Sequence, residues 1–207
     1  MARILLGVTG SVAAIKLPEL DAALTAAGHD VKLVATKAST YFFDPSPLRD
    51  RLSLDEAEWP GPQYRRGDDV LHIELRKWAD AFVMAPLDAN TLAKLSMGLC
   101  DNLLTSIWRA WDPLRPVVAA PAMNTLMWQH PLTKQHLRAL GMMFGALHVP
   151  GHLTEEQMVD QINERSRNLW IAPPVSKVLA CGDEGIGAMA AVPDLVAGVE
   201  RLLSQRG

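Results

Sequence analysis

Short apolar runs, each bounded by Gly, Pro or a polar residue, recur along the chain. The first covers residues 3–9 and stops at Gly10. Comparable runs cover residues 31–36, 80–85, 116–120 and 168–172, and Pro86 follows the third of them. Continuous apolar runs of this length are typical of strands buried on both faces of a sheet. We therefore predict five buried strands, the third ending at Pro86.

The stretches between these runs have helical character. After Ser11, apolar residues at Leu17, Leu20 and Leu24 follow helical spacing, Pro18 restarts the helix and Gly28 ends it. Residues 88–97, 101–111 and 131–140 are also compatible with helices, and residues 193–203 form an amphipathic closing helix. Strands that alternate with helices indicate right-handed parallel βαβ units. The predicted class is α/β, a doubly wound parallel sheet in one domain spanning residues 1–207.

Two segments stand outside this alternation. Residues 44–62 are rich in turn-forming residues and predict a long surface excursion with little regular structure. Residues 141–167 combine a Met, Gly and His run with a strongly charged stretch, and we interpret them as an inserted surface element. The ligand site is expected elsewhere, at the carboxyl ends of the strands.

Composition excludes several classes of protein. A chain of 207 residues with a net charge of −3 and no long run of one sign lacks the electrostatic pattern of a nucleic-acid binder. Apolar runs are too short for a membrane helix, and the N-terminal run is too short for a signal peptide. Two cysteines cannot form a disulfide framework, which favours the cytoplasm. The six histidines lack metal-site spacing, so no metal is expected.

Polar turns follow the first three predicted strands. Because carboxyl ends of parallel strands meet at one edge of a sheet, these turns are expected to converge. Their hydroxyls, amides and one cation suit a phosphate and a hydroxylated chain, although each turn could also simply cap a helix. The first turn lacks the third glycine of the dinucleotide fingerprint, which favours a mononucleotide or another anion. The turns contain Gly10 and Ser11; Thr36, Lys37 and Ser39; and Asp88, Ala89, Asn90 and Thr91.

Three further residues could carry chemistry. His72 could exchange a proton near neutral pH, and Glu74 could tune it if the segment were a strand, although a lone His is often structural. Asn124 follows the fourth strand and could donate to a carboxylate. Cys181 lies in a glycine-rich segment that could form a flap and deliver a proton. Cys100, within a helical stretch, is predicted to be a small buried hydrophobe.

Met123, Met127 and Trp128 surround Asn124 in sequence, and two interpretations of them stay open. They could line the site or simply fill the core.

Taken together, these segments resemble the flavin-dependent cysteine decarboxylases. The combination of Pro-x-Met-Asn at residues 121–124 with Cys-Gly-Asp-x-Gly-x-Gly at residues 181–187 is the most specific part of the resemblance. Flavin prenyltransferases share the fold but lack that pair of motifs. The remaining matches follow the order of the family and cover residues 10–16, 71–76, 85–94, 100–104, 109–112, 121–128 and 179–189.

The resemblance implies a Rossmann-like fold, FMN as cofactor and a homotrimer with active sites between subunits. The implied reaction is decarboxylation of 4'-phosphopantothenoylcysteine to 4'-phosphopantetheine in coenzyme A biosynthesis. It gives His72 the role of base and Cys181 that of acid, and it places Asn124 and Met127 against the substrate. The implied FMN contacts are Gly10, Ser11, Val12, Thr36, Lys37, Ser39, Asp88, Ala89, Asn90, Thr91 and Ala122.

Two other functions share this fold. Some fungal relatives with this fold are similar to regulatory subunits that inhibit a protein phosphatase. The second alternative stays within enzymes and is a decarboxylase that acts on the C-terminal cysteine of a peptide. The regulators often lack one catalytic residue, whereas His72, Asn124 and Cys181 are all present here. This favours catalysis over regulation.

Overall fold

A six-stranded parallel sheet organises the molecule. The computed structural model describes residues 1–59, 61–63, 65–178 and 184–205. The strands lie in the order β3-β2-β1-β4-β5-β6, with all neighbours parallel. Chain order reverses between β1 and β4, and in such sheets ligands bind at this switch point, beyond the carboxyl ends of the strands. The strands are β1 (Arg3–Val8), β2 (Asp30–Ala35), β3 (Leu52–Ser53), β4 (Ala81–Leu87), β5 (Val117–Pro121) and β6 (Leu169–Ile171).

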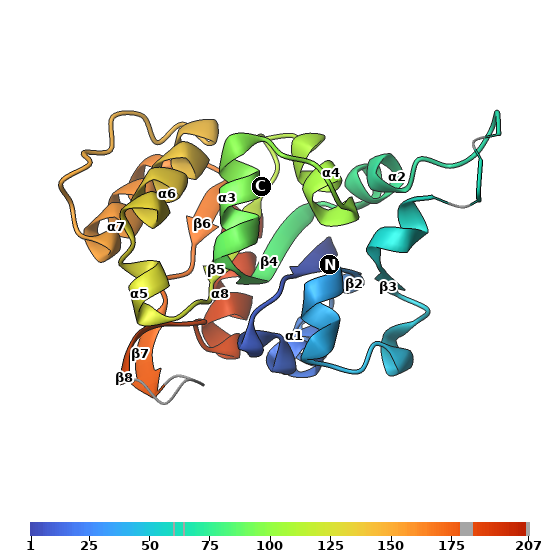
Figure 1. Cartoon of the computed structure of the whole chain (residues 1–207), viewed down its shortest axis with the longest axis horizontal. Coiled ribbons are helices and arrows are strands. Elements are labelled where there is room, and N and C mark those ends of the chain that lie inside the picture. The colour runs from blue at the N-terminus through green and yellow to red at the C-terminus, as the bar shows by residue number, and fades with distance from the viewer. Residues whose placement is uncertain (60, 64, 179–183, 206–207) are drawn as a thin grey trace.

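Helices cover both faces of this sheet (Figure 1). On one face α1 (Leu17–Ala26) and α8 (Val192–Ser204) share a core with Ile4, Leu6 and Val83. On the other face the core includes Leu5 and Phe82, together with Trp128 of the short helix α5 (Thr125–Trp128) and residues of five longer helices. Alternate strand residues thus enter opposite cores, as the two-residue period of a strand requires. Those five helices are α2 (Leu71–Trp78), α3 (Ala89–Met97), α4 (Leu103–Arg109), α6 (Pro131–Met143) and α7 (Glu155–Arg165).

Short elements complete the chain. An antiparallel pair, β7 (Val175–Val178) and β8 (Glu184–Ala188), lies apart from the main sheet (Figure 1). The one-turn helices occur at loops and strand ends, and they are η1 (Val12–Lys16), η2 (Lys37–Tyr41), η3 (Ser46–Leu48), η4 (Asp55–Glu58) and α5 (Thr125–Trp128).

The predicted doubly wound sheet is confirmed, with all five predicted strands present. Two details of the strands differ. β4 does not end before Pro86 but continues to Leu87, because Leu87 still pairs with Pro121 of β5. The excursion at residues 44–62 contains β3, which adds to the sheet edge beside Leu33. A strand of two residues is too short to show any periodicity.

The interpretation of residues 141–167 as a surface element is wrong for part of that segment. α6 extends into it as far as Met143, and α7 buries Met158, Val159 and Ile162 in the core. A Cβ on Gly141 would lie 2.9 Å from Ile162, so glycine permits the close contact between α6 and α7. The high charge of α7 belongs to its outer face and conceals the narrow apolar stripe in the sequence.

The described residues contain neither a candidate membrane-spanning helix nor a candidate metal-binding cluster. No helix within the described ranges combines the length and apolar character that a membrane span requires. Within those same ranges, His, Cys, Asp and Glu side chains form no group of three that could hold a metal ion.

Candidate active site

Thr9 ties the two strands at the switch point together. Its main-chain N–H and its hydroxyl both donate to the carbonyl of Pro86, over 3.2 and 2.9 Å. The same hydroxyl accepts the N–H of Asp88 at 2.7 Å, and Thr9 is fully buried. This residue therefore fixes the turns after β1 and β4 relative to each other. The sequence analysis missed it, because a single Thr at a strand end carries no signal of its own.

Gly10 lies where the three polar turns meet. A Cβ at this position would lie 2.8 Å from Cβ of Ala38 and 3.1 Å from Oδ2 of Asp88, which closes the space to any other residue. Asp88 caps α3 by accepting the N–H of Thr91 at 2.6 Å. No hydrogen bond within the described residues uses the N–H groups of Gly10 and Val12. The turns after β1, β2 and β4 thus converge, and this edge of the sheet keeps free donors.

The turn after β2 contributes one further polar group. The hydroxyl of Ser39 is buried and donates to the carbonyl of Thr36 at 2.7 Å, so it serves the turn itself. Oγ1 of Thr36 is buried and has no hydrogen-bond partner among the described residues. Two other predicted contacts, Lys37 in this turn and Asn90 at the start of α3, are exposed. A third, Ala122 after β5, is held at the same edge because its N–H donates to the carbonyl of Leu87 at 2.9 Å. The predicted contacts therefore share one edge, while their role in holding a cofactor stays a prediction.

Asp55 supports the same turn from outside. Its carboxylate accepts the N–H of Lys37 at 3.3 Å and the N–H of Leu103, at the start of α4, at 3.2 Å. Burial raises the pKa of Asp55 above its ordinary value of 3.8, against the opposing effect of these two hydrogen bonds. One acidic side chain of η4 thus links the turn after β2 to α4.

His72 lies on α2, and its acidic partner is Glu58 of η4. Nδ1 of His72 is hydrogen-bonded to Oε1 of Glu58, and the main-chain N–H of His72 donates to Oε2 at 3.1 Å. The Glu58 side chain is 8% exposed and that of His72 is 25% exposed. The suggestion that Glu74 tunes His72 is wrong, because the segment is a helix and Glu74 pairs with Lys77 at 3.0 Å.

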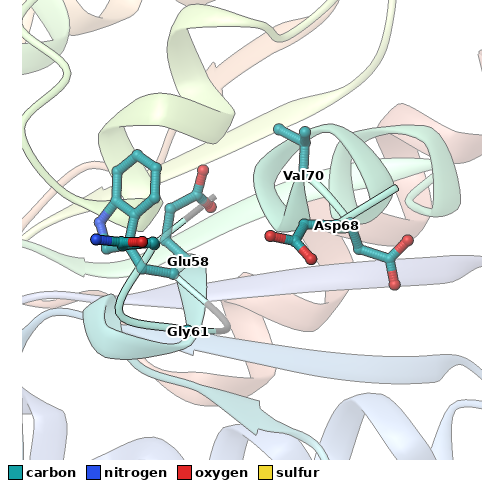
Figure 2. Close-up of a pocket in the computed structure, with 7 residues that line it drawn as sticks. Glu58, Gly61, Asp68 and Val70 are labelled. Carbon is teal, nitrogen blue, oxygen red and sulfur yellow. The ribbon is translucent and has the colours of Figure 1, made fainter. Parts of the chain in front are cut away.

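A cavity of about 110 Å³ lies beside this pair (Figure 2). Glu58 and Val70, which flank it, also belong to the segments that carry the His72 pair. Trp59 in its wall is 76% exposed, and Val70 is 46% exposed. Apolar side chains left open to water beside a polar pair are typical of surfaces that another molecule covers. The cavity is lined by Glu58, Trp59, Gly61, Gln63, Asp68, Asp69 and Val70.

Asn124 lies after β5 and caps α5. Its Oδ1 accepts the N–H of Met127 at 2.8 Å, which leaves its Nδ2 group to donate to a ligand. Its three neighbours Met123, Met127 and Trp128 could line the site or fill the core, and the structure shows that they differ. Met123 and Trp128 are buried in the core, whereas Met127 is exposed together with Leu126.

The glycines of the Cys181 segment have a steric explanation. A Cβ on Gly185 would lie 2.4 Å from Oγ1 of Thr125, and one on Gly187 would lie 2.3 Å from the carbonyl oxygen of Met123. The carbonyl of Gly187 also accepts the N–H of Met123 at 2.9 Å. Glycine therefore allows β8 to pack against the turn that carries Asn124. Cys181 itself lies outside the described residues.

Cys100 differs from expectation. It is a free thiol in the loop between α3 and α4, and it is exposed rather than buried. α3 ends at Met97 and α4 begins only at Leu103, after the Asn102 cap, so Cys100 lies outside both helices.

The two parts of the candidate site lie at opposite ends of one chain. Figure 1 shows α2, which carries His72, at one end of the long axis and α5, beside Asn124, at the other. The structure thus brings the three polar turns together at one edge of the sheet, but it leaves α2, which carries His72, far from α5, which Asn124 caps.

A model of the flavoprotein family matches residues 1–204, so the chain belongs to that family. Among curated relatives, the phosphopantothenoylcysteine decarboxylase of Mus musculus is 46% identical over 206 residues, covering 99% of this chain and 89% of the relative. One similar solved structure is a cysteine-to-serine mutant of PPC decarboxylase complexed with pantothenoylaminoethenethiol. Its TM-score is 0.78 and its sequence identity is 42%, and the match covers 98% of this chain and 98% of that one. The FMN binding protein AtHal3 has the same TM-score and identity, covering 100% of this chain and 98% of that one.

Proposed function

We propose that this protein is an FMN-dependent decarboxylase that converts 4'-phosphopantothenoylcysteine to 4'-phosphopantetheine. The observation that carries the proposal is the pairing of His72 with the buried Glu58, because it provides a proton acceptor with a defined free nitrogen. Relatives of similar length named for this activity support the substrate. The reaction is a step of coenzyme A biosynthesis.

The residues at the switch point fit FMN. Gly10 has no space for a side chain. Among the described residues, the N–H groups of Gly10 and Val12 have no hydrogen-bond partner and can bind phosphate oxygens, and the hydroxyl of Thr36 is likewise unpartnered. We assign to the cofactor the residues that share this edge. When bound, FMN supplies the electron sink that loss of CO₂ from a cysteine carboxylate requires, since no side chain provides one. The assigned contacts are Gly10, Ser11, Val12, Thr36, Lys37, Ser39, Asp88, Ala89, Asn90, Thr91 and Ala122.

Four side chains act on the substrate in this proposal. Nε2 of His72 accepts a substrate proton, since Nδ1 is already bound to Glu58. Nδ2 of Asn124 donates to the substrate carboxylate and holds it in place, and the exposed Met127 packs beside it. The thiol of Cys181 donates the final proton to the product, an assignment that rests on the family motif.

A homotrimer belongs to the same proposal. His72 and Asn124 lie at opposite ends of one chain, so a complete site needs a second copy. Each end also exposes apolar side chains: Trp59 and Val70 near His72, and Leu126 and Met127 near Asn124. A contact between two different ends is heterologous, and three such contacts can close into a ring. A cytoplasmic location is part of the proposal, because two cysteines give no disulfide framework.

The test uses the purified protein with 4'-phosphopantothenoylcysteine. We expect a yellow protein with FMN absorbance that releases one CO₂ per substrate, and a His72→Asn variant that still binds FMN but releases none. Protein that is loaded with FMN and yet releases no CO₂ would contradict the proposal. Parallel assays with a peptide ending in cysteine and with a protein phosphatase identify the two alternative functions.

A further inference from the structure

We infer that Glu58 is the positioning residue of the site: it holds the His72 ring with a proton on Nδ1, so that Nε2 is the atom that receives the substrate proton. The inference rests on the proposed function for what Nε2 does. The geometry that places the ring stands independently of it.

One carboxylate fixes both the main chain and the ring of His72. Oε2 of Glu58 accepts the main-chain N–H of His72, and Oε1 contacts Nδ1 of the ring. A carboxylate can only accept, so Nδ1 must carry the proton in this pair. Glu58 thus holds His72 at two points, the main-chain N–H in the first turn of α2 and Nδ1 of the imidazole ring. This leaves a single orientation in which Nε2 has a free lone pair.

Glu58 also replaces the missing cap of α2. The first N–H groups of a helix lack partners within it, and the cap residue Val70 offers no side-chain acceptor. His72 is the second residue of α2, and its N–H finds the Glu58 carboxylate of a different element. Negative charge is favoured at this end of a helix. The start of α2 and the orientation of His72 therefore depend on the same side chain.

The surroundings of Glu58 favour a positioning role over a surface ion pair. The Glu58 side chain is only 8% exposed, whereas that of Glu74, on the same helix as His72, is 56% exposed and pairs with Lys77. Exposed pairs contribute little, while a carboxylate enclosed with an imidazole holds it firmly. Carboxylates that orient a catalytic histidine in this way fix its tautomer. Glu74 therefore serves as a matched control.

The test compares Glu58→Gln with Glu74→Gln in the FMN-loaded protein. Glutamine keeps the size and can still accept the main-chain N–H of His72 through its carbonyl. Its NH₂ group then faces Nδ1 and can only donate, so the ring must carry its proton on Nε2 instead. We expect kcat of Glu58→Gln to fall at least about tenfold with little change in KM, because the base has the wrong tautomer. Glu74→Gln should match the parent protein.

Nitrogen-15 NMR of labelled histidine rings gives a readout that does not depend on activity. The His72 signals, identified by their loss in His72→Asn, should show a protonated Nδ1 in the parent protein and a protonated Nε2 in Glu58→Gln. An unchanged tautomer in a folded Glu58→Gln protein would overturn the inference, as would an unchanged kcat. If the parent protein releases no CO₂, the proposed function fails while the tautomer comparison still decides the role of Glu58. Should Glu58→Gln fail to fold, Glu58→Asp is measured in the same way and must retain the parent tautomer.

Discussion

Replacement of Cys181 by serine separates the two halves of the proposed reaction. A serine hydroxyl is a far weaker acid than a thiol, so Cys181→Ser should still release CO₂ but stall before the final proton is delivered. We expect an oxidised enethiol product two mass units lighter than 4'-phosphopantetheine, detected by mass spectrometry of the reaction mixture. Cys100→Ser changes an exposed thiol in a loop and is the matched control. Normal product from Cys181→Ser would show that another group is the acid.

The residue types of the candidate site follow from the sequence, but their partners do not. His72 stands out because an imidazole can exchange a proton near neutral pH, and Asn124 because it directly follows a buried strand, although a lone His is often structural and Asn commonly caps a helix. Glu58 lies 14 residues from His72 across an irregular segment, so no periodicity joins them. Glu74 looked suitable only on the assumption of a strand. Contacts between separate elements are set by packing, which a local pattern does not contain.

Among the elements, β1 and β4 are joined at their starts by Asp80. Its carboxylate accepts the main-chain N–H of Arg3 at 2.9 Å and two hydrogen bonds from the Arg3 guanidinium, at 3.2 and 2.9 Å. This guanidinium lowers the pKa of Asp80 below its ordinary value of 3.8, against the opposing effect of burial. The unfolded chain then binds the proton more tightly than the folded one. The stabilisation is therefore complete above that ordinary value and is lost as the pH falls below it.

Asp80→Asn should accordingly lower the melting temperature at pH 7, by no more than about 4 °C because the ion pair is partly exposed. The difference between parent and variant should shrink as the pH falls to the lowest value at which both still fold. Calorimetry across that pH range measures it. Asp50→Asn, which removes an exposed carboxylate with no partner among the described residues, should leave the melting temperature nearly unchanged. A difference that grows on acidification would refute the linkage.

Long, strongly apolar elements could be predicted, whereas short or mixed ones could not. The strands β1, β2 and β4 are visible in the sequence as continuous apolar runs, because both of their faces are buried. The burial of α7 is hard to predict because its three buried residues are surrounded by charged ones. The helical state of α2 is ambiguous in the sequence because only Leu75 is buried. β3 exists only because β2 offers a free edge for two residues. In each case the deciding contact belongs to a neighbouring element.

At the scale of the whole molecule, the sheet order accounts for the separation of the two parts of the proposed site. α2 precedes β4 and α5 follows β5, and both lie at the outer ends of the fold in Figure 1. The cofactor edge lies between them at the switch point of β1 and β4. The alternation of strands and helices in the sequence predicts the doubly wound topology. The separation of α2 from α5 could not be predicted in this way, because it depends on how the elements pack in the folded chain. The family resemblance implies an intersubunit site, and the separation of α2 from α5 is the physical argument for the one proposed here.

Mixed assemblies test this arrangement directly. His72→Asn and Asn124→Ala chains, each inactive alone, are co-expressed with different tags and the mixed trimers are isolated. A site that takes His72 from one chain and Asn124 from its neighbour is intact whenever the two unaltered ends meet. Each isolated mixed trimer contains both kinds of chain, so one of its three heterologous interfaces joins two unaltered ends, and about a third of the parent CO₂ release should return. Mixing His72→Asn with Glu58→Gln should restore nothing beyond the residual activity of Glu58→Gln, because both changes fall in the same end. Equal failure of both mixtures would place the complete site within one chain.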